Sequence, residues 1–190
     1  MSERSLFYKK IYFTIKMCEL FYHSKSGTYF PGESDGLSLY SIGTRTKFKL
    51  VVYGIGLYVD NQDTYGNTID EKSFELNDKK MLLLNFYRSV GNEKIMNAFI
   101  EGLQQRININ GLENEINQFK QIFSSIDTIN YKDTLKLIFE NGSLVINYCR
   151  DGHQEICLGK LTNELLIKNI FNIYLDDNSV TQDIKKRYFD

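Results

Sequence analysis

The sequence predicts an α+β fold in which helices cover one face of a large antiparallel sheet. Strand-like segments come in two blocks, two helix-like segments stand between the blocks, and further helical segments follow the second block. Elements that come in blocks, rather than in strict alternation, are typical of antiparallel sheets with segregated helices. The length of 190 residues favours a single domain, which we expect to cover residues 1–190.

Period-two patterns indicate the strands of the first block. Apolar and polar residues alternate over 8–16, which predicts a strand. Residues 23–36 are rich in Ser, Gly and Asp and contain the sole proline, which predicts a loop. The segment 43–46 (Gly-Thr-Arg-Thr) is expected to form a turn or bend between two strands. The other strands expected in this block are 37–42, 47–59 and the apolar run 81–87.

Helical periodicity follows, and a second block of strands comes after it. Apolar residues recur at helical spacing over 92–103 and 112–123. Asn141-Gly142 between two alternating runs predicts a tight hairpin. Thr162 is expected to cap a helix that runs to Leu175. The remaining expected elements are strands over 134–140, 143–148 and 155–158 and a short final helix over 181–188.

Composition and charge exclude several classes of protein. The net charge is −1, and Lys and Arg form no basic stripe, so no nucleic-acid interface is expected. There is no apolar run long enough for a membrane-spanning helix. Charged residues interrupt the first 16 residues, so we expect no secretory signal and a cytoplasmic location. The aromatic fraction of 14%, all Tyr and Phe, indicates a bulky apolar interior or pocket.

Motifs for generic enzyme or metal chemistry are missing from the sequence. Cys18, Cys149 and Cys157 contain no C-x-x-C pair, which predicts free thiols in a reducing compartment. The two histidines are far apart, so no metal site is expected. There is no P-loop, G-x-S-x-G or H-E-x-x-H segment. Gly54 and Gly56 lack the third glycine of a dinucleotide fingerprint and indicate close packing against a strand.

A more specific pattern begins with residues 43–58, GTRTKFKLVVYGIGLY. Four further segments follow: LLNFYRSVGNEK from residue 83, NYKD from 130, LGKL from 158 and FNIYLDDNSV from 171. In this order they resemble the motifs of chalcone-isomerase-like proteins. Lys132 and Asp176 stand where that family usually has glycine. The resemblance covers roughly residues 37–186.

The resemblance implies an open-faced β-sandwich: a large antiparallel sheet backed by a layer of helices, with a ligand cleft between them. In the family's fatty-acid binders, an arginine at the position of Arg45 meets the anionic group of the ligand, and a tyrosine stands at the position of Tyr53. A guanidinium offers a carboxylate two parallel donors, and a tyrosine ring can also pack on an acyl chain. The implied function is non-catalytic binding of a fatty acid or similar apolar carboxylate, without a cofactor.

The resemblance also implies that the catalytic residues are missing. Aligning residues 92–95 (Asn-Glu-Lys-Ile) with the isomerases' S-E-K-V motif places Gly91 at their catalytic tyrosine and Ala98 at their asparagine. Glycine cannot polarise a ketone or order a water molecule, and Tyr87 is the nearby residue that would have to substitute. We therefore expect no isomerase activity. An intramolecular lyase acting on a chalcone-like substrate is one alternative, and a ligand-free interaction module is the other.

The geometry of the site is less determined by the sequence. Arg45 and Tyr53 are eight residues apart, and a straight strand would separate them by about 26 Å. They share one carboxylate only if the chain bends, which we expect at 43–47. Arg88 is expected in a salt bridge or helix contact. The candidate pocket-lining residues, which would equally suit a plain core, are Tyr40, Tyr58, Phe86, Phe99 and Phe171.

Overall fold

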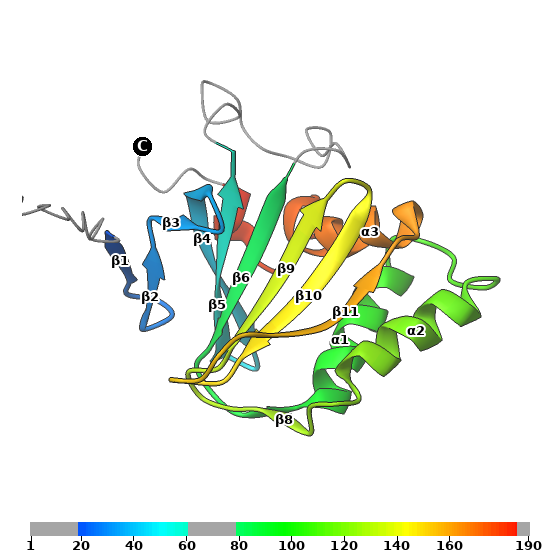
Figure 1. The fold of residues 1–190 in the computed structure, drawn as a ribbon, viewed down its shortest axis with the longest axis horizontal. Helices are drawn as coiled ribbons and strands as arrows, with labels where there is room; N and C mark the ends of the chain where they lie inside the picture. Colours follow the sequence, from blue (N-terminus) through cyan, green and yellow to red (C-terminus); the bar gives the residue numbers. More distant parts are fainter. Residues whose placement is uncertain (1–18, 61–78, 186–190) are drawn as a thin grey trace, which may run out of the picture.

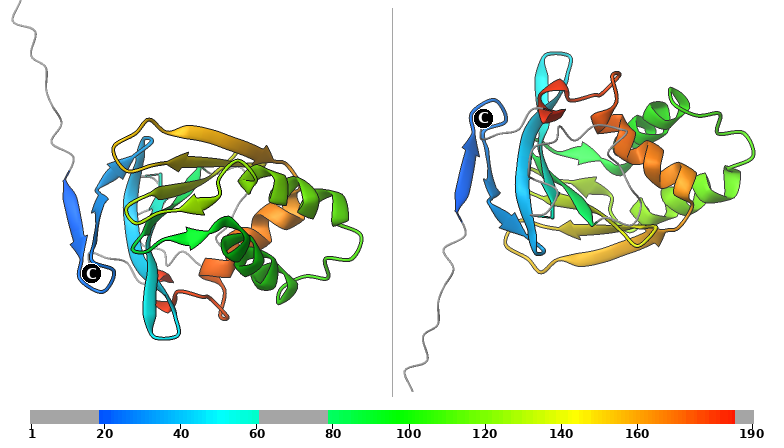
Figure 2. Two further views of the ribbon diagram at one scale, coloured as in Figure 1. Left: turned by 90° about the horizontal axis from the view of Figure 1, so that it is seen from below. Right: turned by 90° about the horizontal axis from the view of Figure 1, so that it is seen from above.

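The computed structural model describes residues 19–60 and 79–185. The predicted strand 8–16, Cys18 and the end of the predicted helix 181–188 lie outside these ranges. Within them, a seven-stranded sheet curls around a layer of helices (Figures 1 and 2). Every neighbouring pair of its strands is antiparallel. The predicted α+β class, with helices backing an antiparallel sheet, is confirmed.

The sheet has the order β11-β10-β9-β6-β5-β4-β3. The apolar run predicted as a doubly buried strand is β6, which lies between β5 and β9. A separate two-stranded hairpin of β1 and β2 and a small β7–β8 pair complete the strands. Their bounds are β1 Leu20–His23, β2 Thr28–Pro31, β3 Glu33–Ser34, β4 Leu37–Lys47, β5 Leu50–Val59, β6 Lys80–Phe86, β7 Val90–Gly91, β8 Thr128–Ile129, β9 Thr134–Glu140, β10 Ser143–Cys149 and β11 Ile156–Leu161.

Three α-helices form the second layer. α1 (Asn92–Gln104) and α2 (Glu113–Phe123) agree with the predicted helices to within a residue at each end. α3 (Glu164–Leu175) is capped by Asn163, whose side chain accepts a bond from the Leu166 N–H, so the cap is one residue later than the predicted Thr162. A short 3₁₀ helix, η2 (Gln182–Lys185), follows. No helix among the described residues is long and apolar enough to cross a bilayer.

Two predictions of local structure are wrong. The segment 43–46 is not a turn, because β4 continues through it to Lys47 and the chain reverses at Phe48 and Lys49. Both of these residues have positive φ, 51° and 61°. The segment 23–36, predicted as a loop, contributes to β1, β2 and β3. In both segments, hydrogen-bonded pairing with other strands outweighs the weak turn or loop preference of the local sequence.

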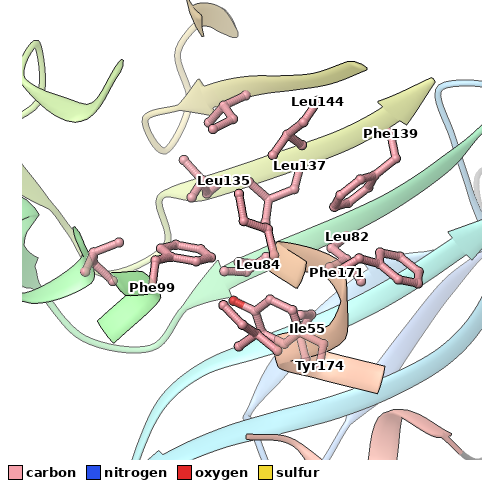
Figure 3. Close-up of a cluster of buried hydrophobic side chains, with 14 of the residues drawn as sticks. Ile55, Leu82, Leu84, Phe99, Leu135, Leu137, Phe139, Leu144, Phe171 and Tyr174 are labelled. Atoms are coloured by element: carbon pink, nitrogen blue, oxygen red, sulfur yellow. The ribbon is translucent and has the colours of Figure 1, made fainter. Parts of the chain in front are cut away.

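The main core lies between the sheet and the helices (Figure 3). Strand residues such as Ile55, Leu84 and Leu135 point toward Phe99 of α1 and Tyr174 of α3 in this view. Each of these five side chains is at least 95% buried. Burial of each such side chain stabilises the fold by about 1.5–3 kcal/mol. The helix layer is therefore fixed to the sheet by apolar packing.

The β1–β2 hairpin covers part of the opposite face of the sheet. Phe30 of β2 is fully buried there against a second cluster that includes Tyr58. A Cβ on Gly54 would lie 2.7 Å from the Ser26 and Thr28 hydroxyls, and one on Gly56 would lie 2.9 Å from the Phe30 ring. The inference that these glycines permit close packing is confirmed.

Several sequence signals have clear structural counterparts. Asn141 and Gly142 both have positive φ and close the β9–β10 hairpin, as predicted. Lys132, which stands where the family usually has glycine, adopts φ 70°. Cys149 and Cys157 are free thiols, as predicted.

Asp176, the second residue at a usual glycine position, ends α3 with an ordinary φ of −77°. Its carboxylate accepts a hydrogen bond from Arg106 Nη2 at 2.8 Å, and its other oxygen lies 2.7 Å from Nε in an ion pair. The side chains are 5% and 11% exposed. This buried ion pair holds the end of α3 against the chain that follows α1.

Candidate ligand-binding site

A cavity of about 560 Å³ opens between the tip of the β4–β5 hairpin, α1 and the end of α3. Ligand sites in proteins commonly enclose about 300–1,000 Å³, so its size suits a small molecule. Apolar side chains from these elements and from β6 form most of its inner wall. They include Val52, Leu84, Ile95, Phe99 and Ile173.

The register of the hairpin brings Arg45 and Tyr53 together on the cavity wall. Arg45 of β4 is the direct cross-strand partner of Tyr53 of β5, and directly opposite residues have Cβ atoms about 5 Å apart. The bend expected at 43–47 is therefore not needed, because the reversal at 48–49 provides the approach. The register shifts between Arg45 and Thr46, and Val52 lines the cavity beside Tyr53. In a regular strand, consecutive side chains point to opposite faces, so either Val52 or Tyr53 would point away from the cavity. The shift in register allows both side chains to line it.

Tyr174 completes the polar end of the cavity. Its hydroxyl lies 3.2 Å from the Tyr53 hydroxyl, and the residues are 1% and 8% exposed. Burial raises the pKa of Tyr53, although the Tyr174 hydroxyl and the Arg45 guanidinium oppose this. Burial, the nearby Tyr53 and the bond to it raise the pKa of Tyr174 well above its usual value. Both phenols therefore stay protonated at neutral pH and can donate to an anion.

Arg45 supplies the positive charge at this end. It is half-buried, and its Nη1 donates to the Val180 carbonyl at 3.4 Å. Within 19–60 and 79–185, no carboxylate forms an ion pair with it. A guanidinium beside two phenolic hydroxyls can accept a carboxylate with charge-assisted hydrogen bonds. We refer to Arg45, Tyr53 and Tyr174 as the polar triad.

The mouth of the cavity is also basic. Lys47, Arg88 and Lys94 line it, and Glu101 is the acidic residue among the lining side chains. The Arg88 Nε donates to the Val51 carbonyl at 2.8 Å, and no carboxylate of the described residues forms the expected salt bridge with it. An anionic ligand would meet positive potential along its entry route.

Only one of the five aromatic pocket candidates lines this cavity, namely Phe99. Phe86, which was expected to line the pocket, instead lies behind Tyr53, with ring centroids 5.3 Å apart. Tyr58 faces the other side of the sheet, where its hydroxyl donates to the Pro31 carbonyl. Phe171 packs on Phe139 at 4.9 Å, and Tyr40 is buried in the main core. An apolar pattern on a strand or helix indicates burial but not which buried residues border a void.

Gly91 and Ala98, the positions that correspond to catalytic residues in the isomerases, both lie on the cavity wall. A Cβ added at Gly91 would meet nothing within 4 Å. Tyr87 packs edge-on against Tyr131 at 5.9 Å and is not a lining residue. It therefore does not occupy the place of the missing tyrosine.

Sequence reasoning missed Tyr174, Val180 and the mouth residue Lys94. A signal for Tyr174 does exist, because a tyrosine on the apolar face of a helix needs a hydrogen-bond partner when it is buried. Its partner Tyr53 is 121 residues away in the sequence. Only the packing of α3 against β5 identifies the pair.

Known proteins resemble this chain in sequence pattern and in fold. A sequence model described as chalcone isomerase-like matches residues 28–188. A comparison with curated protein sequences finds no match. The crystal structure of the Arabidopsis thaliana fatty-acid binding protein AtFAP1 superposes with a TM-score of 0.69 at 20% sequence identity, covering 88% of this chain and 94% of that one. The match over most of its length shows that the chain belongs to the chalcone isomerase-like family.

Proposed function

We propose that this protein binds a fatty acid, or a similar apolar carboxylate, without catalysing its conversion. The observation that carries the proposal is the polar triad set into a largely apolar cavity. An amphiphile with one anionic end and a long hydrocarbon tail matches a cavity that has one polar end and an otherwise apolar wall. The description of AtFAP1 as a fatty-acid binding protein supports the same class of ligand.

The energetics favour a carboxylate over a neutral apolar molecule. A carboxylate that leaves water for an apolar site without a partner loses several kcal/mol of hydration, as buried ions do. Arg45 offsets this loss with a charge that no carboxylate of the described residues neutralises. The Tyr53 and Tyr174 phenols supply additional donors. A neutral ligand would leave the guanidinium without a counter-charge.

The tail contributes through the apolar wall. Each buried methylene adds about 0.8 kcal/mol, which corresponds to about fourfold in affinity. We therefore expect affinity to rise about fourfold per added methylene until the cavity is filled, and then to level off. Displacement of a fluorescent fatty acid by saturated acids of increasing length measures this series. The methyl esters serve as controls, because they keep the tail and lose the charge.

Native mass spectrometry of protein purified from cells separates this proposal from a ligand-free module. A retained mass that matches a fatty acid, and that a competing acid displaces, supports binding. Absence of any retained mass, together with no displacement by any acid in the series, would refute the proposal. Equal affinity for acids and esters would also refute it, because the triad would then have no role.

A further inference from the structure

The tip of the β4–β5 hairpin presents an apolar side chain to solvent between two cations. Phe48 is 88% exposed, the highest value among large hydrophobic residues of the described ranges, and Leu50 is 51% exposed. Lys47 and Lys49 flank Phe48 and are also exposed. The Lys47 Nζ lies 6.0 Å from the centre of the Phe48 ring. Figure 2 shows this tip, coloured cyan, standing out from the body of the fold.

The tip is continuous with the mouth of the cavity. Lys47, Phe48 and Leu50 all line it, and Arg88 and Lys94 lie at the same opening. The carboxylate among the described lining residues is that of Glu101, and Glu93 precedes Lys94 in the sequence. Among the described residues that line the cavity, cations therefore outnumber carboxylates, although the whole chain has a net charge of −1.

From this arrangement we infer that the hairpin tip docks on a bilayer surface that contains anionic lipids. An exposed aromatic ring flanked by lysines is suited to the interface, because the ring enters the acyl boundary while the lysines reach the headgroups. Each lysine near an anionic surface strengthens binding about fivefold. The inference rests on the proposed function in one respect: docking places the mouth where a membrane-dissolved acid can enter or leave.

Phe48 occupies the tip of the hairpin although the backbone conformation at this position disfavours a phenylalanine. Residues 48 and 49 both have positive φ, the conformation for which Asn-Gly is preferred, as at Asn141-Gly142 in this chain. Two other exposed aromatic residues differ in their setting. Tyr22 and Tyr29 pack on each other on the β1–β2 hairpin, with tilted rings whose centroids are 5.0 Å apart, and neither lines the cavity.

The chain contains no tryptophan, so a single Trp substitution provides a direct probe. The Phe48→Trp variant is titrated with phosphatidylcholine vesicles and with vesicles of phosphatidylcholine mixed with phosphatidylserine. We expect its emission to shift to the blue with the mixed vesicles and to be quenched by brominated acyl chains. The matched control is Tyr29→Trp, at a position 59% exposed on the β1–β2 hairpin; its emission should not shift.

The charge contribution is tested with Lys49→Glu in the Phe48→Trp background. Lys49 does not line the cavity, so fatty-acid affinity in solution should be retained. Partition onto mixed vesicles should fall about thirtyfold, since two units of charge are changed. Lys168→Glu, at an exposed position of α3, makes the same charge change away from the tip and should leave partition unchanged.

Three results would overturn the inference. They are an unshifted Phe48→Trp spectrum on mixed vesicles, an equal loss of partition for Lys49→Glu and Lys168→Glu, and a blue shift that grows with protein concentration without vesicles. The last result would assign the tip to contact between copies of the chain. Fatty-acid displacement in solution is measured separately, so failure of docking is distinguishable from failure of the proposed function.

Discussion

Replacing Arg45 tests the site at its most specific point. Arg45→Ala removes the guanidinium and leaves both phenols of the triad in place. A carboxylate bound there would lose its counter-charge inside a partly desolvated wall. Truncation of one member of such a buried pair weakens binding by about 2–5 kcal/mol, so we expect affinity for a fatty acid to fall at least thirtyfold.

The fold should tolerate this substitution. Arg45 is half-buried, it makes one long hydrogen bond to the Val180 carbonyl at 3.4 Å, and no ion pair joins it to a described residue. Substitutions without core contacts usually change stability by less than about 0.5 kcal/mol. Tyr53→Phe differs, because it also leaves the buried Tyr174 hydroxyl without its partner. It should therefore reduce both affinity and stability.

The assay is displacement of a fluorescent fatty acid, with urea unfolding measured on the same samples. Arg45→Lys should restore part of the affinity, because an ammonium group cannot form the two-pronged contact. Arg150→Ala, at an exposed position outside the cavity, is the control for loss of one arginine. Added salt should weaken binding little, because a partly buried pair is poorly screened.

Equal affinities for the wild type, Arg45→Ala and Arg45→Lys would refute the assignment of Arg45 as the anchor. A larger loss for Arg88→Ala, accompanied by strong salt dependence, would instead place the carboxylate at the mouth. Either result would show that the cross-strand pair of Arg45 and Tyr53 is not the recognition site.

Three further predictions concern catalysis and stability. Chalcone cyclisation, followed by absorbance, should not exceed the spontaneous rate, because Gly91 and Ala98 carry no donor; turnover that survives repurification would contradict this. Phe48→Asn combined with Lys49→Gly should stabilise the fold by about 1–2 kcal/mol in urea unfolding, because both positions have positive φ; an unchanged or lower stability would show that the turn carries no strain. Arg106→Ala should destabilise the fold by about 3–5 kcal/mol, because it leaves the Asp176 carboxylate buried without its partner, and the same loss in Arg106→Ala/Asp176→Ala would show that the unpaired charge is not the cause.

The elements that could be predicted from the sequence are those with strong local signals. α1 and α2 have long apolar stripes, and Asn141-Gly142 has the residues that a tight hairpin requires. The position of the β4–β5 reversal could not be predicted in this way. Gly43 and its neighbours have the composition of a turn, whereas Phe48 and Lys49 do not. The actual turn is held by the pairing of nine of the ten β5 residues with β4.

The residues of the candidate site also fall into those that could be predicted from the sequence and those that depend on long-range packing. Arg45 and Tyr53 were found through the resemblance of residues 43–58 to a known family, and their approach to each other depends on the hairpin register. Tyr174 and Val180 come from the other end of the chain and reach the cavity only because α3 packs on the sheet. Local patterns contain no information about such long-range contacts. Four aromatic candidates outside the cavity show the same limit, because burial alone does not distinguish core from pocket wall.

One hairpin connects the proposed anchor with the proposed docking tip. Arg45 lies near the end of β4, and Phe48 begins the turn three residues later, so the anchor lies about 10 Å behind the tip at the usual rise of a strand. Amphipathic elements at an interface enter it by about 5–10 Å. A tip inserted to that depth would place the triad close to the headgroup layer, where the carboxylate of a membrane-dissolved fatty acid resides. The acid could then exchange with Arg45 while its tail moved between two apolar environments, without crossing bulk water.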